Sequence, residues 1–401
     1  KTPRQKALLE REMVDHADNL TGWIASRLAK WNFDTYRWVL QSLSDRQLKA
    51  GEPEVAIALL TYFIDYARIL NTGDKAASAI LDISRSILYA LLDKLAAADP
   101  QRWTRTDIKS GAVAAPAHPQ QQTLLVDARG FEPEGIDPKL ALAAFLRQAY
   151  ESGWRRFILY RVNGQRLIST AVMGRSDTDD VEIDVYGTPG EYFGAFMQGG
   201  TIRCHGNAQN FTAMGMHHGN LYIYGNAGKV CGYASKGGSV FILGDIVDRG
   251  WTNSVNDPRC QDLKVHILGS ASKYCGESLM GGDFFFGGLY FDKQGQLRTQ
   301  ARPYRGTKLL GGASRGNMLF FDPYHRLDPH QYTHGKLTEM TADDWPKWQT
   351  MVEATLMLAG VVIDEENGIR SFIADGKTFP LTPEHFRLIV PSGGLKGYES
   401  H

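Results

Sequence analysis

The sequence has few cysteines, no excess charge of either sign and no long apolar run. Its 44 basic and 44 acidic side chains leave a formal net charge of zero, which is not the signature of proteins that bind nucleic acids or anionic membranes. The four cysteines include no Cys-x-x-Cys pair, so they describe neither a disulfide scaffold nor a zinc or iron–sulfur module. No run of eighteen uncharged apolar residues occurs. We therefore expect no nucleic-acid or membrane partner.

What remains is a globular composition with 43% hydrophobic and 22% charged residues, long enough for two or three domains. A cytoplasmic location is the expectation, although the sequence begins at Lys1 and not at Met, which leaves a removed targeting segment open. Glycine is unevenly distributed. Of the 42 glycines, 26 lie between Gly187 and Gly316, whereas residues 1–108 contain three. The chain therefore changes character along its length.

Residues 1–108 show the periodicity of helices. Apolar side chains recur every three or four residues between Pro53 and Leu70 and again between Ile80 and Leu95. We predict a small helical bundle over 1–108. Its aromatic residues form either the bundle core or a surface that docks a partner protein, and the sequence does not separate the two.

Residues 109–122 have no apolar periodicity, two prolines and three consecutive glutamines, and we expect a linker there. Residues 123–180 are expected to form an αβ segment that leads into the next region. Asp137-Pro138 is typical of a helix start, and Asn163-Gly164 is typical of a tight hairpin. The predicted elements are a helix over 137–152 and strands at Thr123–Asp127, Phe157–Tyr160 and Gln165–Ala171.

A 19-residue period dominates the centre of the chain. The marker glycines are spaced by 19, 19, 19, 25 and 19 residues, the fourth interval being one period plus six, and they are Gly187, Gly206, Gly225, Gly244, Gly269 and Gly288. Positions four and two residues before each marker are apolar in all six repeats, from Ile183 and Val185 to Phe284 and Phe286. Alternate residues of a strand point the same way, so these columns predict an inward face that is stacked from repeat to repeat.

Short repeats that cannot bury their own apolar face must stack on one another, which predicts a parallel β-helix solenoid over 181–322 with glycines at its sharp corners. The outward columns, three and one residues before each marker, become aromatic and aliphatic in the later repeats. That face is expected to be covered, either by another segment of this chain or by another polypeptide. The residues that we single out as a possible interface are Tyr222, Tyr224, Phe241 and Phe285.

Several runs resemble the GXGXG domain, the C-terminal β-helix of the glutamate synthase large chain, which also occurs as one of the separate polypeptides of formylmethanofuran dehydrogenases. The matching runs are VDARGFEPEGID (126–137), GWRRFILYRVNGQR (153–166), IDVYGTPGEYFGAFMQGG (183–200) and HGNAQN (205–210). The resemblance covers roughly 123–319 and implies a right-handed parallel β-helix within a larger oxidoreductase assembly. In glutamate synthase this domain is a scaffold without catalytic residues.

The chain departs from full-length glutamate synthase in three respects. Residue 1 is lysine and not the cysteine nucleophile, the first cysteine is Cys204, and the chain has neither room for an FMN barrel nor a cysteine cluster for an iron–sulfur centre. The resemblance thus implies an assembly role, with FMN and iron–sulfur clusters on partner subunits and no catalytic, cofactor-binding or metal-binding residue in this chain.

Some residues invite a chemical role and have a structural explanation that we favour. Cys231 and Cys275 occupy equivalent positions two repeats apart, too far for a direct disulfide. His217-His218, and likewise His325, His330 and His334, lack the converging ligands of a metal site. Asp245 and Asp248 would suit a carbohydrate-active groove, but the acids do not recur in neighbouring repeats.

Residues 323–401 are expected to form an α/β cap on the solenoid, with a capped helix over Thr341–Met357 and strands at Phe372–Phe379 and Phe386–Val390. The predicted fold is thus multidomain α + β, a helical bundle followed by the β-helix. The predicted function is a non-catalytic structural subunit of a glutamate-synthase-like oxidoreductase or amidotransferase complex. The alternatives are the GXGXG scaffold of a formylmethanofuran-dehydrogenase-type complex and a freestanding β-helix enzyme acting on carbohydrate or acyl groups.

Overall fold

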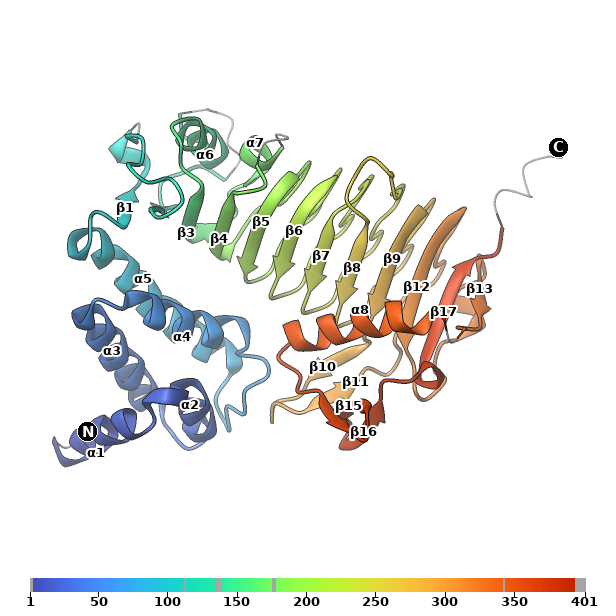
Figure 1. Cartoon of the computed structure of the whole chain (residues 1–401), viewed down its shortest axis with the longest axis horizontal. Helices are drawn as coiled ribbons and strands as arrows, with labels where there is room; N and C mark the ends of the chain where they lie inside the picture. Colours follow the sequence, from blue (N-terminus) through green and yellow to red (C-terminus); the bar gives the residue numbers. More distant parts are fainter. Residues whose placement is uncertain are drawn as a thin grey trace. The chain divides into compact units, whose positions relative to one another are not determined.

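A computed structural model describes residues 3–111, 113–133, 137, 139–174, 178–341 and 343–393. The chain divides into two compact units. Unit 1 consists of Lys1–Arg105 and Phe291–Gln296, and unit 2 consists of Thr106–Tyr290 and Leu297–His401. N-terminal helices make up most of unit 1, and unit 2 is built on a large, mostly parallel sheet (Figure 1). Within the described residues, no helix combines the length and the apolar character that crossing a membrane requires.

The helices of unit 1 fall where the apolar periodicity predicts helical structure. They are α1 (Pro3–Asp15), α2 (Leu20–Leu28), α3 (Phe33–Ala50), α4 (Pro53–Asp65) and α5 (Ala77–Ala98). Asn32 caps α3, because its side-chain oxygen accepts a 2.9 Å hydrogen bond from the backbone N–H of Thr35. Gly51 ends the same helix at φ = 77°, a left-handed conformation that suits glycine.

Unit 2 begins at Thr106, the last residue of β1 (Trp103–Thr106). Its parallel strands and the two helices between them follow in chain order: β2 (Thr123–Asp127), α6 (Leu142–Glu151), β3 (Arg156–Asn163), α7 (Thr170–Met173), β4 (Glu182–Thr188), β5 (Gln198–His205), β6 (His218–Ile223), β7 (Ser239–Ile242), β8 (Lys264–Ile267), β9 (Met280–Phe286) and β12 (Arg315–Phe321). The short strands β10 (Leu289–Phe291) and β11 (Leu297–Thr299) pair with each other. Figure 1 shows β3 to β12 as one row of strands in sequence order.

The register of these strands is the one that the 19-residue spacing predicts. Ile183 pairs with Ile202, and the same column continues through β6, β7 and β8 to Phe284 of β9. This inward column also extends beyond the predicted repeats, to Phe157 and Leu124 on one side and to Met318 on the other. All of these side chains are buried. The strands β2 and β3 of the predicted αβ segment therefore belong to the same sheet as the repeats.

The connecting segments pack onto the same core and bond to one another from repeat to repeat. Phe193, Cys231 and Trp251 lie in these segments and belong to the core cluster that the inward columns form. The N–H of Phe211 donates to the carbonyl of Lys229, and the equivalent N–H of Val230 donates to Asp248. Each repeat is thus bonded to the next along its connecting segment as well as along its strand.

The marker glycines serve mainly close approach and not the positive φ that we expected of corner glycines. Among the six, only Gly187 and Gly288 have φ in the left-handed region. At Gly225 an added Cβ would lie 2.5 Å from the carbonyl oxygen of Gly206, and at Gly269 it would lie 2.5 Å from that of Gly244. A side chain would therefore force successive repeats apart.

Left-handed residues recur instead in the connecting segments, three per repeat at alternate positions. They are 192, 194 and 196 in one repeat, followed by 211, 213 and 215; 230, 232 and 234; 249, 251 and 253; 274, 276 and 278; and 308, 310 and 312. Most are not glycine, Trp251 and Leu310 among them. Because left-handed φ costs about 1–2 kcal/mol for such residues, the surrounding packing and hydrogen bonds must hold these corners.

Three local predictions for the αβ segment and the C-terminal segment are wrong. No hairpin forms at Asn163-Gly164, because β3 runs through to Asn163 in parallel pairing with β4, and Thr170–Met173 is helical. The helix expected over 137–152 begins at Leu142, while Asp137 accepts a hydrogen bond from the N–H of Lys139; Pro138 lies outside the described residues. The single strand expected at Phe372–Phe379 is a hairpin of two strands.

The C-terminal segment contributes the last strands of the large sheet and a small separate sheet. Its elements are β13 (Gly335–Thr338), α8 (Trp345–Leu358), β14 (Asp364–Glu366), β15 (Ile369–Ala374), β16 (Lys377–Pro380) and β17 (Phe386–Pro391). β17 pairs antiparallel with β12, and β13 pairs antiparallel with β17. Thr341 and Asp344 bond reciprocally before α8, since the Thr341 hydroxyl donates to the Asp344 carboxylate and the N–H of Asp344 donates back. The helix itself begins at Trp345, so its N-cap residue is Asp344, whose side chain makes no cap hydrogen bond, and the cap predicted at Thr341 is also wrong.

Candidate functional site

The outer face of the large sheet, formed by strand side chains that point away from the core, carries charged and aromatic residues on β4, β5 and β6. Neighbouring strands pair Asp184 with Arg203, and Tyr186 with His205, directly across the sheet. Arg203 in turn lies beside Tyr222 on β6. The 19-residue period thus brings acidic, basic and aromatic side chains into contact.

Asp184, Arg203 and His205 form a charged cluster on this face. The Nε2 atom of His205 lies 3.2 Å from Oδ1 of Asp184, and the guanidinium of Arg203 lies 3.6 Å from the same oxygen. Arg203 also lies 3.4 Å from Glu182. Burial opposes ionisation of Asp184, but the hydrogen bond from His205 and the charge of Arg203 outweigh it, so the pKa of Asp184 is lowered. The carboxylate therefore stays charged.

Aromatic rings stack on both sides of His205. The ring of Tyr186 lies 4.2 Å away at an interplanar angle of 12°, and that of Tyr224 lies 5.6 Å away at 7°. His205 is only 3% exposed. The stack fixes the imidazole with one nitrogen against Asp184, an arrangement that stabilises this part of the sheet.

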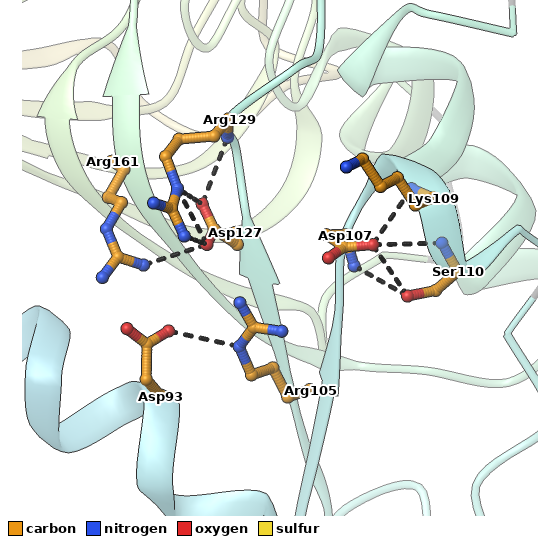
Figure 2. A network of polar contacts seen from close by, with 8 residues as sticks. All are labelled: Asp93, Arg105, Asp107, Lys109, Ser110, Asp127, Arg129 and Arg161. Carbon is orange, nitrogen blue, oxygen red and sulfur yellow. Dashed lines mark hydrogen bonds and ion pairs between the residues drawn. The ribbon is translucent and has the colours of Figure 1, made fainter.

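A second charged cluster lies at the ends of β2 and β3. Asp127 is 1% exposed, and its carboxylate is 2.6 Å from Arg129 and 2.9 Å from Arg161 (Figure 2). Arg161 has φ = 57° at a register shift between β3 and β4, which turns its side chain out of the regular alternation. A buried carboxylate held by two guanidiniums is a structural ion pair of the kind that is costly to break.

The four side chains predicted as an interface differ in exposure. Tyr222 and Tyr224 are half-buried, whereas Phe241 and Phe285 are buried within this chain, at 2% and 1% exposure. Phe285 lies 6.3 Å from Phe386 between ring centroids. Phe241 and Phe285 therefore present no surface to a partner.

The chain's own helix α8 covers part of the later outer face. The Nδ1 atom of His266 on β8 lies 2.9 Å from the hydroxyl of Thr355 in α8, and Figure 1 shows α8 crossing the strands there. His266 is buried, and burial lowers its pKa to about 4. Of the two alternatives for this part of the face, cover by the chain itself is the one that the structure contains.

The acids that suggested a carbohydrate site hold backbone groups of the following repeat. Asp245 accepts a hydrogen bond from the N–H of Ser270, and Asp248 accepts one from the N–H of Lys273. Equivalent bonds occur in the two preceding repeats, where Asn207 accepts from the N–H of Asn226 and Asn226 accepts from the N–H of Asp245. These side chains satisfy backbone donors where the chain leaves each strand.

The histidines that we considered as possible metal ligands also bond to neighbouring groups of the chain. His218 accepts a hydrogen bond from the N–H of Gln261, and His217 lies 2.8 Å from Gln198. His325 contacts Arg387. These imidazoles therefore hold neighbouring groups of the chain in place.

The cysteines differ in burial. Cys204, Cys231 and Cys275 are buried, Cys260 is partly exposed, and Cys231 and Cys275 are not joined by a disulfide, as their spacing predicts. Burial raises the pKa of both Cys231 and Cys275, that of Cys275 to about 12, so these thiols remain protonated. They are core residues and not nucleophiles.

In the part of the chain that the structure describes, no group of three or more His, Cys, Asp or Glu side chains is arranged to hold a metal ion. The clusters around Asp127 and Asp184 were not singled out from the sequence. For Asp184 the signal was present, because Asp184 and Arg203 stand at equivalent positions of successive repeats. For Asp127 the sequence contains no such signal, because the interval between paired residues of β2 and β3 differs from the 19-residue period.

Comparison with known proteins bears on the repeats. Residues 162–283 match the model of the GXGXG motif family. No curated protein matches the chain. The matched segment runs from the end of β3 into β9 and includes five of the six marker glycines. The family match confirms the resemblance for this segment, and residues 162–283 are therefore a GXGXG motif domain.

Proposed function

We propose that this chain is a structural subunit of a glutamate-synthase-like oxidoreductase or amidotransferase complex in the cytoplasm. In this proposal FMN and iron–sulfur clusters belong to partner subunits, and this chain supplies none of the catalytic, cofactor-binding or metal-binding residues. The observation that carries the proposal is the GXGXG motif domain over 162–283, since the resembling domain of glutamate synthase is a scaffold.

We infer further that the repeats wind as a right-handed parallel β-helix. The parallel register of β4 to β9, the hydrogen bonds between equivalent connecting segments, and the single core shared by strands and connections all support this winding. Right-handed crossover between parallel strands is the general rule.

The use of polar side chains also favours a structural role. Asn226, Asp245 and Asp248 satisfy backbone donors of the next repeat, and His218 holds the N–H of Gln261. Side chains bound in this way stabilise the stacking of repeats and are not poised toward a substrate.

The proposal is tested on the protein purified from its source under native conditions. We expect a particle much larger than the 44.6 kDa chain and a flavin absorption spectrum from co-purifying subunits. A monomer of this chain that turns over a carbohydrate or acyl substrate would overturn the proposal. Co-purification of a molybdenum or tungsten pterin in place of flavin would instead identify the formylmethanofuran-dehydrogenase-type assembly.

The half-buried tyrosines give a matched test of where partners bind. Tyr222→Ala removes an aromatic group from the predicted interface, whereas Tyr290→Ala removes one that is 47% exposed elsewhere in unit 2. Loss of partner subunits is expected for the first variant and full retention for the second. Equal retention in both folded variants would exclude Tyr222 from the interface.

A further inference from the structure

Unit 1 contains a surface hollow of about 470 Å³ between the end of α2, the start of α3 and the loop that follows α4. This volume is in the range of small-molecule sites. The residues that matter for its chemistry are Ala29, Lys30, Trp31, Phe33, Asp74 and Lys75. The proposed assembly role does not involve them.

Lys75 brings a largely buried positive charge to this hollow. Its side chain is 6% exposed, and its ammonium donates to the carbonyl oxygen of Ala29 at 3.2 Å. The other contact is with Asp74 at 3.5 Å, and the Asp74 side chain is 95% exposed. A surface ion pair of this length contributes little, while an ammonium has three donors. Lys75 therefore retains capacity for a further acceptor.

The loop that carries Lys75 is fixed in place. Gly73 has φ = 67°, and a Cβ added there would lie 2.7 Å from the carbonyl oxygen of Ala29. The Thr72 hydroxyl also donates to the carbonyl of Lys75 at 2.6 Å. The ammonium is thus held in position before any ligand arrives, which reduces the entropy that binding would cost.

Aromatic side chains form the apolar part of the hollow. The indole of Trp31 packs edge-on against Trp23, with ring centroids 5.3 Å apart at 70°, so its orientation is set by the unit itself. Phe33, the first residue of α3, is 40% exposed. A fixed indole and an exposed phenyl ring favour a flat apolar group.

We propose that this hollow binds a small organic carboxylate with a flat apolar body. The carboxylate accepts a hydrogen bond from the Lys75 ammonium, and the apolar body packs against Trp31 and Phe33.

The test uses phenylacetate and the full-length chain, with binding followed by calorimetry and by quenching of tryptophan fluorescence. Lys75→Met is expected to weaken binding at least about tenfold, as loss of a charge-assisted hydrogen bond does. Lys75→Arg is expected to retain most of the affinity. Lys49→Met, at an exposed lysine in the last turn of α3, is the control and should leave binding unchanged.

Asp74→Asn is expected to change the affinity for phenylacetate in the opposite direction to Lys75→Met. Removal of the competing carboxylate should strengthen phenylacetate binding about two- to fivefold, and this exposed substitution does not threaten folding. The neutral analogue 2-phenylethanol should bind at least about tenfold more weakly than phenylacetate. The proposal is overturned if phenylacetate shows no saturable binding at concentrations on the order of 10 mM, if both compounds bind equally, or if Asp74→Asn leaves the affinity unchanged or lowers it.

Discussion

Substitution of Gly225 by alanine tests whether close approach of repeats, and not backbone conformation, requires the marker glycines. Its φ does not lie in the left-handed region, so alanine is allowed by the backbone alone. An added Cβ would nevertheless lie 2.4 Å from Oδ1 of Asn207 and 2.5 Å from the carbonyl oxygen of Gly206. The carbonyl cannot move without shifting its whole repeat.

The cost follows from what that shift would disturb. Overpacking of a tight site costs about 1–3 kcal/mol. The shift would also stretch the bond from the N–H of Asn226 to Asn207, which is 2.9 Å long, and that from the N–H of Gly244 to Gly225, which is 2.8 Å long. With roughly 1 kcal/mol for a weakened hydrogen bond, Gly225→Ala should lower the unfolding free energy by about 2–4 kcal/mol. With an unfolding entropy of about 2.1 cal/mol/K per residue, that is a fall of roughly 3–7 °C in melting temperature for a unit of this size.

The matched control is Gly376, in the turn between β15 and β16, where φ is 69° and nothing lies within 4 Å of an added Cβ. Asparagine tolerates left-handed φ, so Gly376→Asn should be nearly neutral, whereas Gly225→Asn should be worse than Gly225→Ala. Thermal unfolding followed by circular dichroism gives the comparison. If Gly225→Ala costs no more than Gly376→Asn, repeat-to-repeat contact is not the reason for the marker glycines.

Three further predictions concern unit 2. Ile267→Ala, at a fully buried inward position, should destabilise the protein by about 2–5 kcal/mol in denaturant titrations, and a cost below about 1 kcal/mol would show that the inward columns are loosely packed. His266 has a pKa of about 4 in the folded chain, below its ordinary value of 6.5, so the unfolded state binds more protons between these two pH values. The stability of the protein should therefore fall as the pH drops from 6.5 to 4, by at most roughly 3 kcal/mol from this group. His266→Gln should flatten this pH dependence, and an unchanged dependence would exclude His266 as its source. Asp127→Asn removes the charge that faces Arg129 and Arg161 and should cost about 3 kcal/mol. Glu365→Gln, at the exposed pair with Arg370, should cost less. Equal costs would contradict a structural role for the carboxylate of Asp127.

The inward face of the sheet could be predicted from the sequence because its cause is local and repeated. Columns such as Ile183, Ile202 and Leu221 need only the two-residue alternation of a strand and the constant interval between repeats. The presence of helix α8 was predictable for a similar reason, although it begins at Trp345 and not at the predicted Thr341.

The corners and the outer face could not be predicted in the same way. Trp251 and Leu310 adopt left-handed φ although their types disfavour it, because the neighbouring repeats impose the conformation. Asn163-Gly164 has the chemistry of a hairpin, yet parallel pairing of β3 with β4 takes precedence. The cover of His266 by Thr355 joins residues 89 positions apart, and no pattern in either segment signals that contact.

The bonding of each repeat to its neighbours has a mechanical consequence. Because strands, connecting segments and the Asn226–Asp245–Ser270 ladder all bond to the equivalent position one repeat away, an interior repeat is held on two sides and an end repeat on one. Under heat or pulling force, the repeats should therefore unfold one after another, starting from the ends of the row. The antiparallel pairing of β17 with β12, and of β13 with β17, closes one of these ends. Those two short strands accordingly set how soon that end of the row begins to open.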